Sequence, residues 1–128
     1  MPYKTKERHM EFWRQWRKTA GGVWNGITAR RSKNRSSRSE MKMTRAEFVN
    51  WYNLQDRQCH YCGVGEADLS KYRVKPTSRF SIDRLDNEKP YTVSNIVLAC
   101  VRCNMVKGYT FSPSEMKEIA TKYLIGRL

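Results

Sequence analysis

The sequence predicts an α+β protein, in which N-terminal α-helices precede a small metal-stapled unit of two strands and a short helix, and a further helix closes the chain. Three observations support this class. Apolar residues recur at helical steps in the first 55 residues, whereas the segment from 80 to 98 has two short stretches of β character. Four cysteines flank this segment in two Cys-X-X-Cys pairs. Because a chain of 128 residues builds only one modest core, a metal would add needed stability.

The first helix is predicted over residues 5–19. Its apolar residues recur at steps of three and four, at Met10, Trp13, Trp16 and Ala20. The Gly21-Gly22 pair predicts its end. A second short helix is indicated by Val23, Trp24 and Ile27. Tryptophans at helical spacing belong to a core more often than to a base-stacking surface, so we expect them to be buried.

The segment from 30 to 38 is polar and strongly basic. Residues 1–46 hold 13 of the 25 Lys and Arg residues but only 3 of the 12 acidic ones, in a chain of net charge +13. Such a charge favours a polyanion, with DNA as the leading candidate, over a small-molecule substrate. The segment therefore predicts a solvated arm that contacts phosphates through Arg30, Arg31, Lys33, Arg35 and Arg38.

No apolar run is long enough to span a bilayer, and the opening residues carry neither a signal peptide nor a lipidation signal. We therefore expect an intracellular, cytoplasmic protein without a membrane partner. In that setting paired Cys-X-X-Cys motifs favour a metal over disulfides. Two short loops that each present two sulfurs to one ion predict a structural Zn²⁺ site formed by Cys59, Cys62, Cys100 and Cys103.

The rest of the chain predicts the remaining elements. Thr44 and Glu47 form a capping-box pattern at the start of a helix over 45–55. The segment 73–97 favours β structure, and we expect two antiparallel strands there, the second containing the apolar run Ile96-Val97-Leu98. A short helix is expected over 101–107, and Ser112-Pro113 starts the last helix. We expect two regions: a basic, helical DNA-binding region over 1–56, with its arm at about 30–42, and a metal-stapled module over 57–128.

Two oxygen donors fall in this module. Asp83 ends the first predicted strand, and Asn104 lies on the short helix. A hard cation such as Mg²⁺ or Mn²⁺ takes carboxylate and amide oxygens, and one such ion can stabilise charge on a phosphodiester and help the departing 3′ oxygen. On these residues alone, a catalytic metal site for phosphodiester hydrolysis and ordinary surface carboxylates in a turn at Asp83 and Asp86 are both open.

The stretch around the cysteine pairs resembles the HNH, or ββα-metal, nuclease motif. The motif runs Asp-His, then Asn, then Cys-X-X-Cys-Asn-X-X-Lys, and this chain matches it with Asp83, Asn95, Asn104 and Lys107. The resemblance covers about residues 57–110. It implies a zinc-bound ββα-metal module in which Asp83 and Asn104 bind the catalytic metal and Asn95 ties the loop to the strand. The family contains homing, phage and restriction endonucleases, among which these residues do not choose.

Arg84 stands where the motif has its general-base histidine. An arginine stays protonated and cannot accept a proton from water, but it can hold the scissile phosphate through two hydrogen bonds. The string Asp-Arg-Leu-Asp at 83–86 resembles an HNH-like variant that reads Asp-Arg-Ile-Asp. The base would then be Asp86, solvent hydroxide or a metal-activated water, and we favour Asp86. A metal-ligand role for Asp86 is equally open.

Two classes of function remain. The first is an HNH-type endonuclease that nicks or cuts DNA with one divalent ion, with Arg79 and Lys107 meeting backbone phosphates and a homodimer if both strands are cut. The second is a non-catalytic nucleic-acid-binding zinc ribbon, which the missing histidine favours and the Asp83/Asn104 pair disfavours. A zinc-stabilised RNA-associated module would fit the charge but leaves that pair unexplained.

Overall fold

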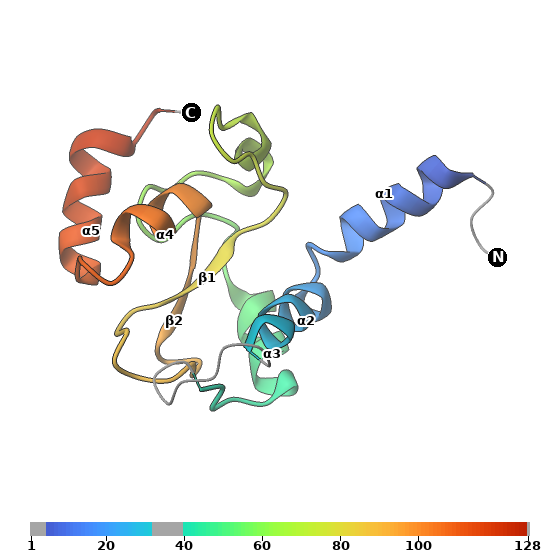
Figure 1. The fold of residues 1–128 in the computed structure, drawn as a ribbon, viewed down its shortest axis with the longest axis horizontal. Helices are drawn as coiled ribbons and strands as arrows, with labels where there is room; N and C mark the ends of the chain where they lie inside the picture. The colour runs from blue at the N-terminus through green and yellow to red at the C-terminus, as the bar shows by residue number, and fades with distance from the viewer. Residues whose placement is uncertain (1–4, 32–39, 128) are drawn as a thin grey trace.

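The computed structural model describes residues 5–31 and 40–127, except for the side chains of Arg30 and Arg31. The helices are α1 (Lys6–Trp16), α2 (Ala20–Arg31), α3 (Arg45–Leu54), α4 (Val101–Lys107) and α5 (Pro113–Ile119), as Figure 1 shows. A 3₁₀-helix, η2, covers Glu66–Lys71, and a π-helical segment, η3, continues α5 over Ala120–Leu124. No helix among the described residues combines the length and apolar character needed to cross a membrane.

A two-stranded antiparallel sheet lies at the centre of the fold. Strand β1 (Ser81–Arg84) pairs with β2 (Ile96–Ala99), so that Asp83 lies opposite Val97. Helix α4 follows β2 directly and packs on β1, and α5 packs on α4 (Figure 1). This order of strand, strand and helix is the ββα arrangement, and the α+β prediction is confirmed.

The glycine pair does not end a helix, contrary to the sequence prediction. Helix α1 stops at Trp16, and α2 begins at Ala20 and runs through both glycines. The Thr19 hydroxyl accepts the Gly22 N–H at 3.2 Å. A Cβ atom at Gly22 would lie 2.3 Å from the Trp16 carbonyl oxygen. The absence of a side chain at Gly22 therefore allows α1 and α2 to approach closely. Helix α2 also includes Arg30 and Arg31, which were expected in a solvated arm.

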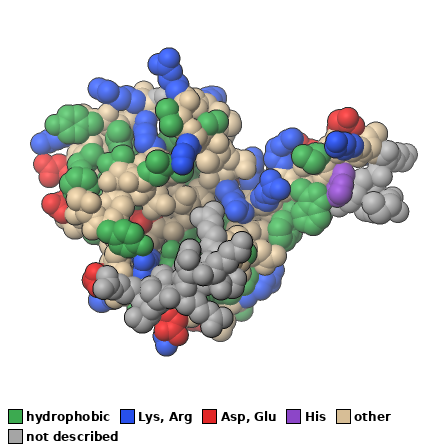
Figure 2. All heavy atoms as spheres, viewed as in Figure 1, with side chains coloured by type: hydrophobic (Ala, Val, Ile, Leu, Met, Phe, Trp, Pro, Cys, Tyr) green, Lys and Arg blue, Asp and Glu red, His purple; other side chains and the backbone are tan. Residues whose placement is uncertain are grey.

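The prediction of buried tryptophans is wrong for α1. This helix has no buried residue, and Trp13 is 42% exposed. Figure 1 shows α1 extending away from the rest of the fold, and Figure 2 shows its apolar side chains at the surface. Phe12 and Trp16 each contact the Trp13 ring edge to face, so the aromatic side chains cover one another only in part. Trp24 and Trp51 do pack against the core.

The core joins α2 and α3 to the sheet and the cysteine loops. Phe48, Tyr52 and Tyr61 are among its largest fully buried side chains. Helix α3 has the predicted capping box, in which Thr44 and Glu47 satisfy each other's backbone N–H groups. One continuous hydrophobic cluster takes side chains from both sides of residue 57, so α3 packs directly against the part of the chain that follows it. The division into two regions at that point stays a prediction.

Candidate active site and metal centre

The four cysteines meet at one point. Cys59, Cys62, Cys100 and Cys103 are all buried, and their sulfur atoms lie within 4.8 Å of one another. Two sulfurs of a tetrahedral Zn²⁺ site are separated by about 3.8 Å, given a Zn–S distance of about 2.3 Å. The Cys62 and Cys100 sulfurs are 3.8 Å apart. The donor set and its spacing thus fit a four-thiolate metal site.

Hydrogen bonds within the cluster shift the pKa values of the thiols in opposite directions. Those from Cys103 and Cys59 lower the pKa of the Cys100 thiol to about 6 and the pKa of Cys62 is lowered as well, whereas the pKa values of Cys59 and Cys103 are raised. The Cys100 N–H donates to the Cys59 sulfur at 3.3 Å, and the Cys103 N–H donates to the Cys100 sulfur at 3.4 Å. The Tyr72 hydroxyl lies 3.9 Å from the Cys62 sulfur. These donors stabilise thiolates, which are the form that binds a metal.

Asp83 lies beside this centre, in the interior. Its side chain is only 6% exposed. The Tyr61 hydroxyl donates to Oδ2 at 2.6 Å, and Lys107 Nζ lies 3.3 Å from Oδ2 and 3.5 Å from Oδ1. Burial and the hydrogen bond to Asp83 raise the pKa of Tyr61, so its hydroxyl stays protonated as the donor. Two donors thus share Oδ2, while Oδ1 has one long contact.

Arg84 and Asn95 organise the loop between the strands. Arg84 is buried, its Nη1 donates to the Lys89 carbonyl at 3.1 Å, and its guanidinium lies 5.0 Å from the Tyr91 ring centre. Asn95 Oδ1 accepts the Asp86 N–H at 2.9 Å, and Nδ2 donates to the Pro90 carbonyl at 3.0 Å. These contacts fix the path of the chain directly after β1.

A groove of about 890 Å³ runs from α2 to α4 across β1. Arg84 and Asn104 line one part of it, and Arg17, Gly26 and Arg79 line another. The half-buried Asn104 side chain has no hydrogen-bond partner in the described parts of the chain. Asp83 is not among the lining residues, because its neighbours Ile82 and Arg84 face the groove while its own side chain turns to Tyr61 and Lys107.

Asp86 lies outside this groove, in the turn after β1. Its side chain is 47% exposed, and Oδ1 accepts the Glu88 N–H at 2.9 Å. The Lys89 ammonium is 4.0 Å from Oδ2. An aspartate that caps a turn in this way is a common structural feature. Its assignment as the base stays a prediction.

The residues expected to contact DNA have different environments. Arg79 Nη1 donates to the Arg17 carbonyl at 3.0 Å and the Gly22 carbonyl at 3.3 Å, so this side chain lies on α2 at the groove. Lys107 is fully buried and donates to the Arg84 carbonyl at 2.9 Å. The expected phosphate contact of Lys107 is therefore corrected: its ammonium is taken up by Asp83. Lys33, Arg35 and Arg38 lie outside the described residues.

Sequence reasoning missed Tyr61 and Arg17. Tyr61 stands between Cys59 and Cys62, and no pattern marks its contact with Asp83, which lies 22 positions away. The only sequence feature that could have pointed to Tyr61 is its position: a bulky phenol lies inside a loop that is expected to surround a metal. Arg17 directly follows α1, four positions before Gly21, and its only sequence signal was a basic residue near the predicted end of that helix.

Comparison with solved structures gives a match to PacI, a rare-cutting HNH restriction endonuclease. The two chains are 30% identical, with a TM-score of 0.69, and the match covers 80% of this chain and 75% of PacI. No family model matches the chain, and no curated protein matches it. Similarity of this extent, together with the ββα order and the buried cysteine cluster, shows that the chain belongs to the HNH endonuclease family.

Proposed function

We propose that this protein is an endonuclease that hydrolyses DNA phosphodiester bonds with a single divalent metal ion. The observation that carries the proposal is the groove, which is lined by Asn104 of the HNH motif, by Arg84 at the position of the motif histidine, and by Arg17 and Arg79. PacI, at 30% identity, is a restriction endonuclease, which supports a DNA substrate.

The groove would hold one strand of the DNA substrate. In the space-filling view Lys and Arg side chains gather where α1 meets the body (Figure 2). A strand that follows β1 would meet Arg79 and Arg17 at one end and Arg84 at the other, and these cations would hold successive phosphates without reading sequence. The side chains of α1 and the segment 30–38 would extend the basic surface along the duplex.

Arg84 would position the scissile phosphate. Its guanidinium is already oriented by the Lys89 carbonyl and the Tyr91 ring, so little side-chain entropy is lost when a phosphate binds. Fixed positive charge beside a phosphoryl group stabilises the charge that develops in the transition state. Arg84 cannot accept the proton of the attacking water, and Asp86 is our candidate for that role. Replacement of Asp86 by Asn tests it.

Two metal sites are part of this proposal. The four thiolates would hold a structural Zn²⁺, for which their spacing is suitable. Asp83 and Asn104 would hold Mg²⁺ or Mn²⁺, since a carboxylate and an amide oxygen are the donors these ions prefer. Asn104 would bind the ion from the groove, and the Asp83 carboxylate would reach it from beside the groove, past Lys107. Oδ1 is the carboxylate atom with the weaker existing contact. A bound divalent cation would neutralise phosphate charge and assist the departure of the 3′ oxygen.

The test is cleavage of supercoiled plasmid by the zinc-loaded protein, first in EDTA and then with Mg²⁺ or Mn²⁺. We expect nicked or linear product only with the added metal. Asp83→Asn and Asn104→Ala should each abolish it. Matched controls are Asp68→Asn, which removes a half-exposed carboxylate paired with Lys71, and Asn53→Ala on the exposed face of α3, and both should cleave normally.

Gel retardation by the wild-type protein without cleavage in either metal would refute the nuclease and leave a DNA-binding zinc module. Full activity of Asp83→Asn would refute the assigned site instead. The ratio of nicked to linear product at early times reports whether one or both strands are cut per encounter, and a dependence of linear product on the square of protein concentration would indicate a homodimer.

A further inference from the structure

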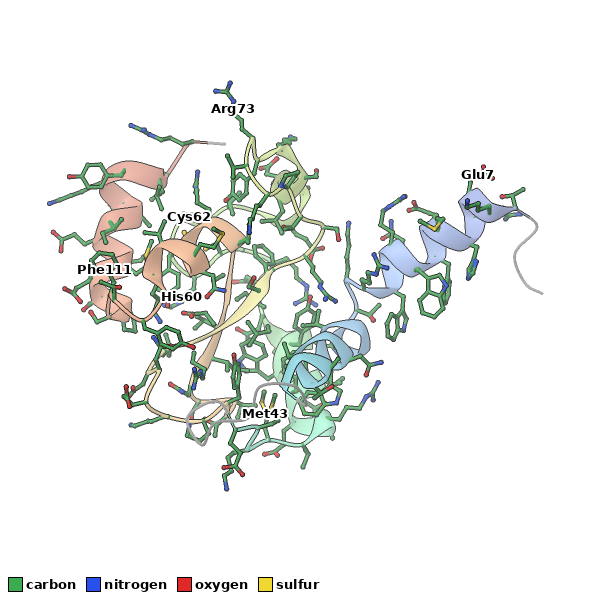
Figure 3. All side chains as sticks on the ribbon, in the orientation of Figure 1. Glu7, Met43, His60, Cys62, Arg73 and Phe111 are labelled. Carbon is green, nitrogen blue, oxygen red and sulfur yellow. The ribbon has the colours of Figure 1, made fainter. Side chains whose placement is uncertain are left out.

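Tyr61 connects the cysteine cluster to the residue assigned as a metal ligand. It occupies the position between His60 and Cys62, inside the first Cys-X-X-Cys loop, and its hydroxyl donates to Asp83 Oδ2 at 2.6 Å. The labelled side chains of His60 and Cys62 in Figure 3 mark this loop. Tyr61 is fully buried. Burying a hydroxyl without a hydrogen-bond partner is costly, and the partner of the Tyr61 hydroxyl is the Asp83 carboxylate. The Tyr61 side chain therefore packs in the core and also hydrogen-bonds Asp83.

The loop holds Tyr61 in place through its backbone. The Cys59 N–H donates to the Val64 carbonyl at 2.9 Å, and the Gly63 N–H donates to the Cys59 carbonyl at 3.0 Å. The His60 N–H donates to the Leu98 carbonyl at 2.8 Å, which fastens the loop to β2. Because β2 pairs with β1, the Tyr61 hydroxyl and Asp83 are set relative to each other through the sheet.

We propose that Tyr61 is a positioning residue, through which the cysteine-bound zinc sets the orientation of the Asp83 carboxylate for the catalytic cation. This inference rests on the proposed function. Tyr61 and Lys107 both engage Oδ2, whereas the one contact of Oδ1 is the 3.5 Å distance to Lys107, so Oδ1 is the oxygen left for a cation. Without the phenol, the Lys107 ammonium, which lies at 3.3 Å from Oδ2 and 3.5 Å from Oδ1, would pull the carboxylate toward itself. The zinc loop then acts on catalysis as well as on folding.

The test is Tyr61→Phe, with Tyr52→Phe as its matched control. Tyr52 is also fully buried, but its hydroxyl donates to the Lys18 carbonyl at 3.0 Å and not to Asp83. For each protein we would measure zinc content, thermal stability, Mn²⁺ binding in the absence of DNA by electron paramagnetic resonance, and plasmid cleavage across Mg²⁺ concentrations. Loss of an outer partner of a metal ligand typically costs about 10- to 100-fold in metal affinity or activity.

We expect Tyr61→Phe to keep its zinc and to lose about 10- to 100-fold in Mn²⁺ affinity, with a matching rise in the Mg²⁺ concentration for half-maximal cleavage. Tyr52→Phe should keep the wild-type Mn²⁺ affinity. Because Mn²⁺ binding is measured on the zinc-loaded fraction well below its melting temperature, a change in stability does not obscure the result. Wild-type Mn²⁺ affinity in Tyr61→Phe would overturn the inference and leave a purely structural phenol.

Asp83→Asn in the same series separates this inference from the proposed function. If Asp83→Asn is inactive while Tyr61→Phe is unchanged, the nuclease site stands and the role of Tyr61 fails. If Asp83→Asn cleaves DNA normally, the assigned site fails and the inference fails with it.

Discussion

Lys107→Met should destabilise the protein far more than the loss of a surface lysine. Lys107 is fully buried, and its ammonium lies 3.3 Å from Asp83 Oδ2 and 2.9 Å from the Arg84 carbonyl oxygen. Methionine keeps most of the volume but leaves the Asp83 charge buried with Tyr61 as its remaining donor. Removing one partner of a buried ion pair costs about 3–5 kcal/mol. For a domain of this size that corresponds to a fall in melting temperature of roughly 10–20 °C.

Urea unfolding at a fixed excess of zinc measures this loss, since bound metal contributes to apparent stability. Lys122→Met is the control: its ammonium lies 3.2 Å from Glu118 in an exposed helical pair, which contributes about 0.5 kcal/mol or less. The double variant Asp83→Asn/Lys107→Met should be more stable than Lys107→Met, because no unpaired charge remains inside. A Lys107→Met protein no less stable than Lys122→Met would refute the reasoning from burial.

Three further predictions concern the metal, the helix junction and the arm. Cys100→Ser should lose zinc and unfold the module in circular dichroism, because a structural metal contributes folding free energy directly; zinc loss with an unchanged melting temperature would contradict this. Gly22→Ala should cost about 1–3 kcal/mol in urea unfolding, since its Cβ would lie 2.3 Å from the Trp16 carbonyl oxygen. Gly21→Ala should be tolerated, because its Cβ would meet only the movable end of the Arg45 side chain. The last prediction concerns the basic arm, in which five residues are replaced together by neutral ones: Arg30, Arg31, Lys33, Arg35 and Arg38. DNA affinity should fall about equally for all sequences, and its dependence on salt concentration should become weaker. Unchanged affinity and salt dependence would show that the arm does not contact DNA.

Features set by near neighbours in the chain were predictable. The Thr44/Glu47 capping box and the Ser112/Glu115 cap form as expected because both partners lie within one helical turn. The cysteine cluster was predictable because each Cys-X-X-Cys spacing specifies half of a tetrahedral site. The ββα order followed from these fixed points and from the apolar pattern of the strands.

Features set by tertiary packing were not predictable. Trp13 has the spacing of a core residue, but no described element covers that face of α1. Lys107 has the chemistry of a surface residue, and its burial depends on Asp83, a partner 24 positions away. Gly22 would end a helix by intrinsic preference, yet the approach of α1 makes it the residue that fits inside α2. In each case a distant contact outweighs a local preference.

The arginine at position 84 is part of the structure of its loop as well as a candidate phosphate ligand. Its guanidinium reaches the Lys89 carbonyl and lies against Tyr91, whose N–H donates to the Glu40 carbonyl at 2.9 Å. A histidine side chain is too short to make the same contacts from β1, so the loop and the arginine depend on each other. Because arginine stays protonated, Arg84 cannot be the proton acceptor in the proposed reaction. Arg84 therefore helps to hold the loop that links β1 to residues 40–42, whatever part it has in phosphate binding.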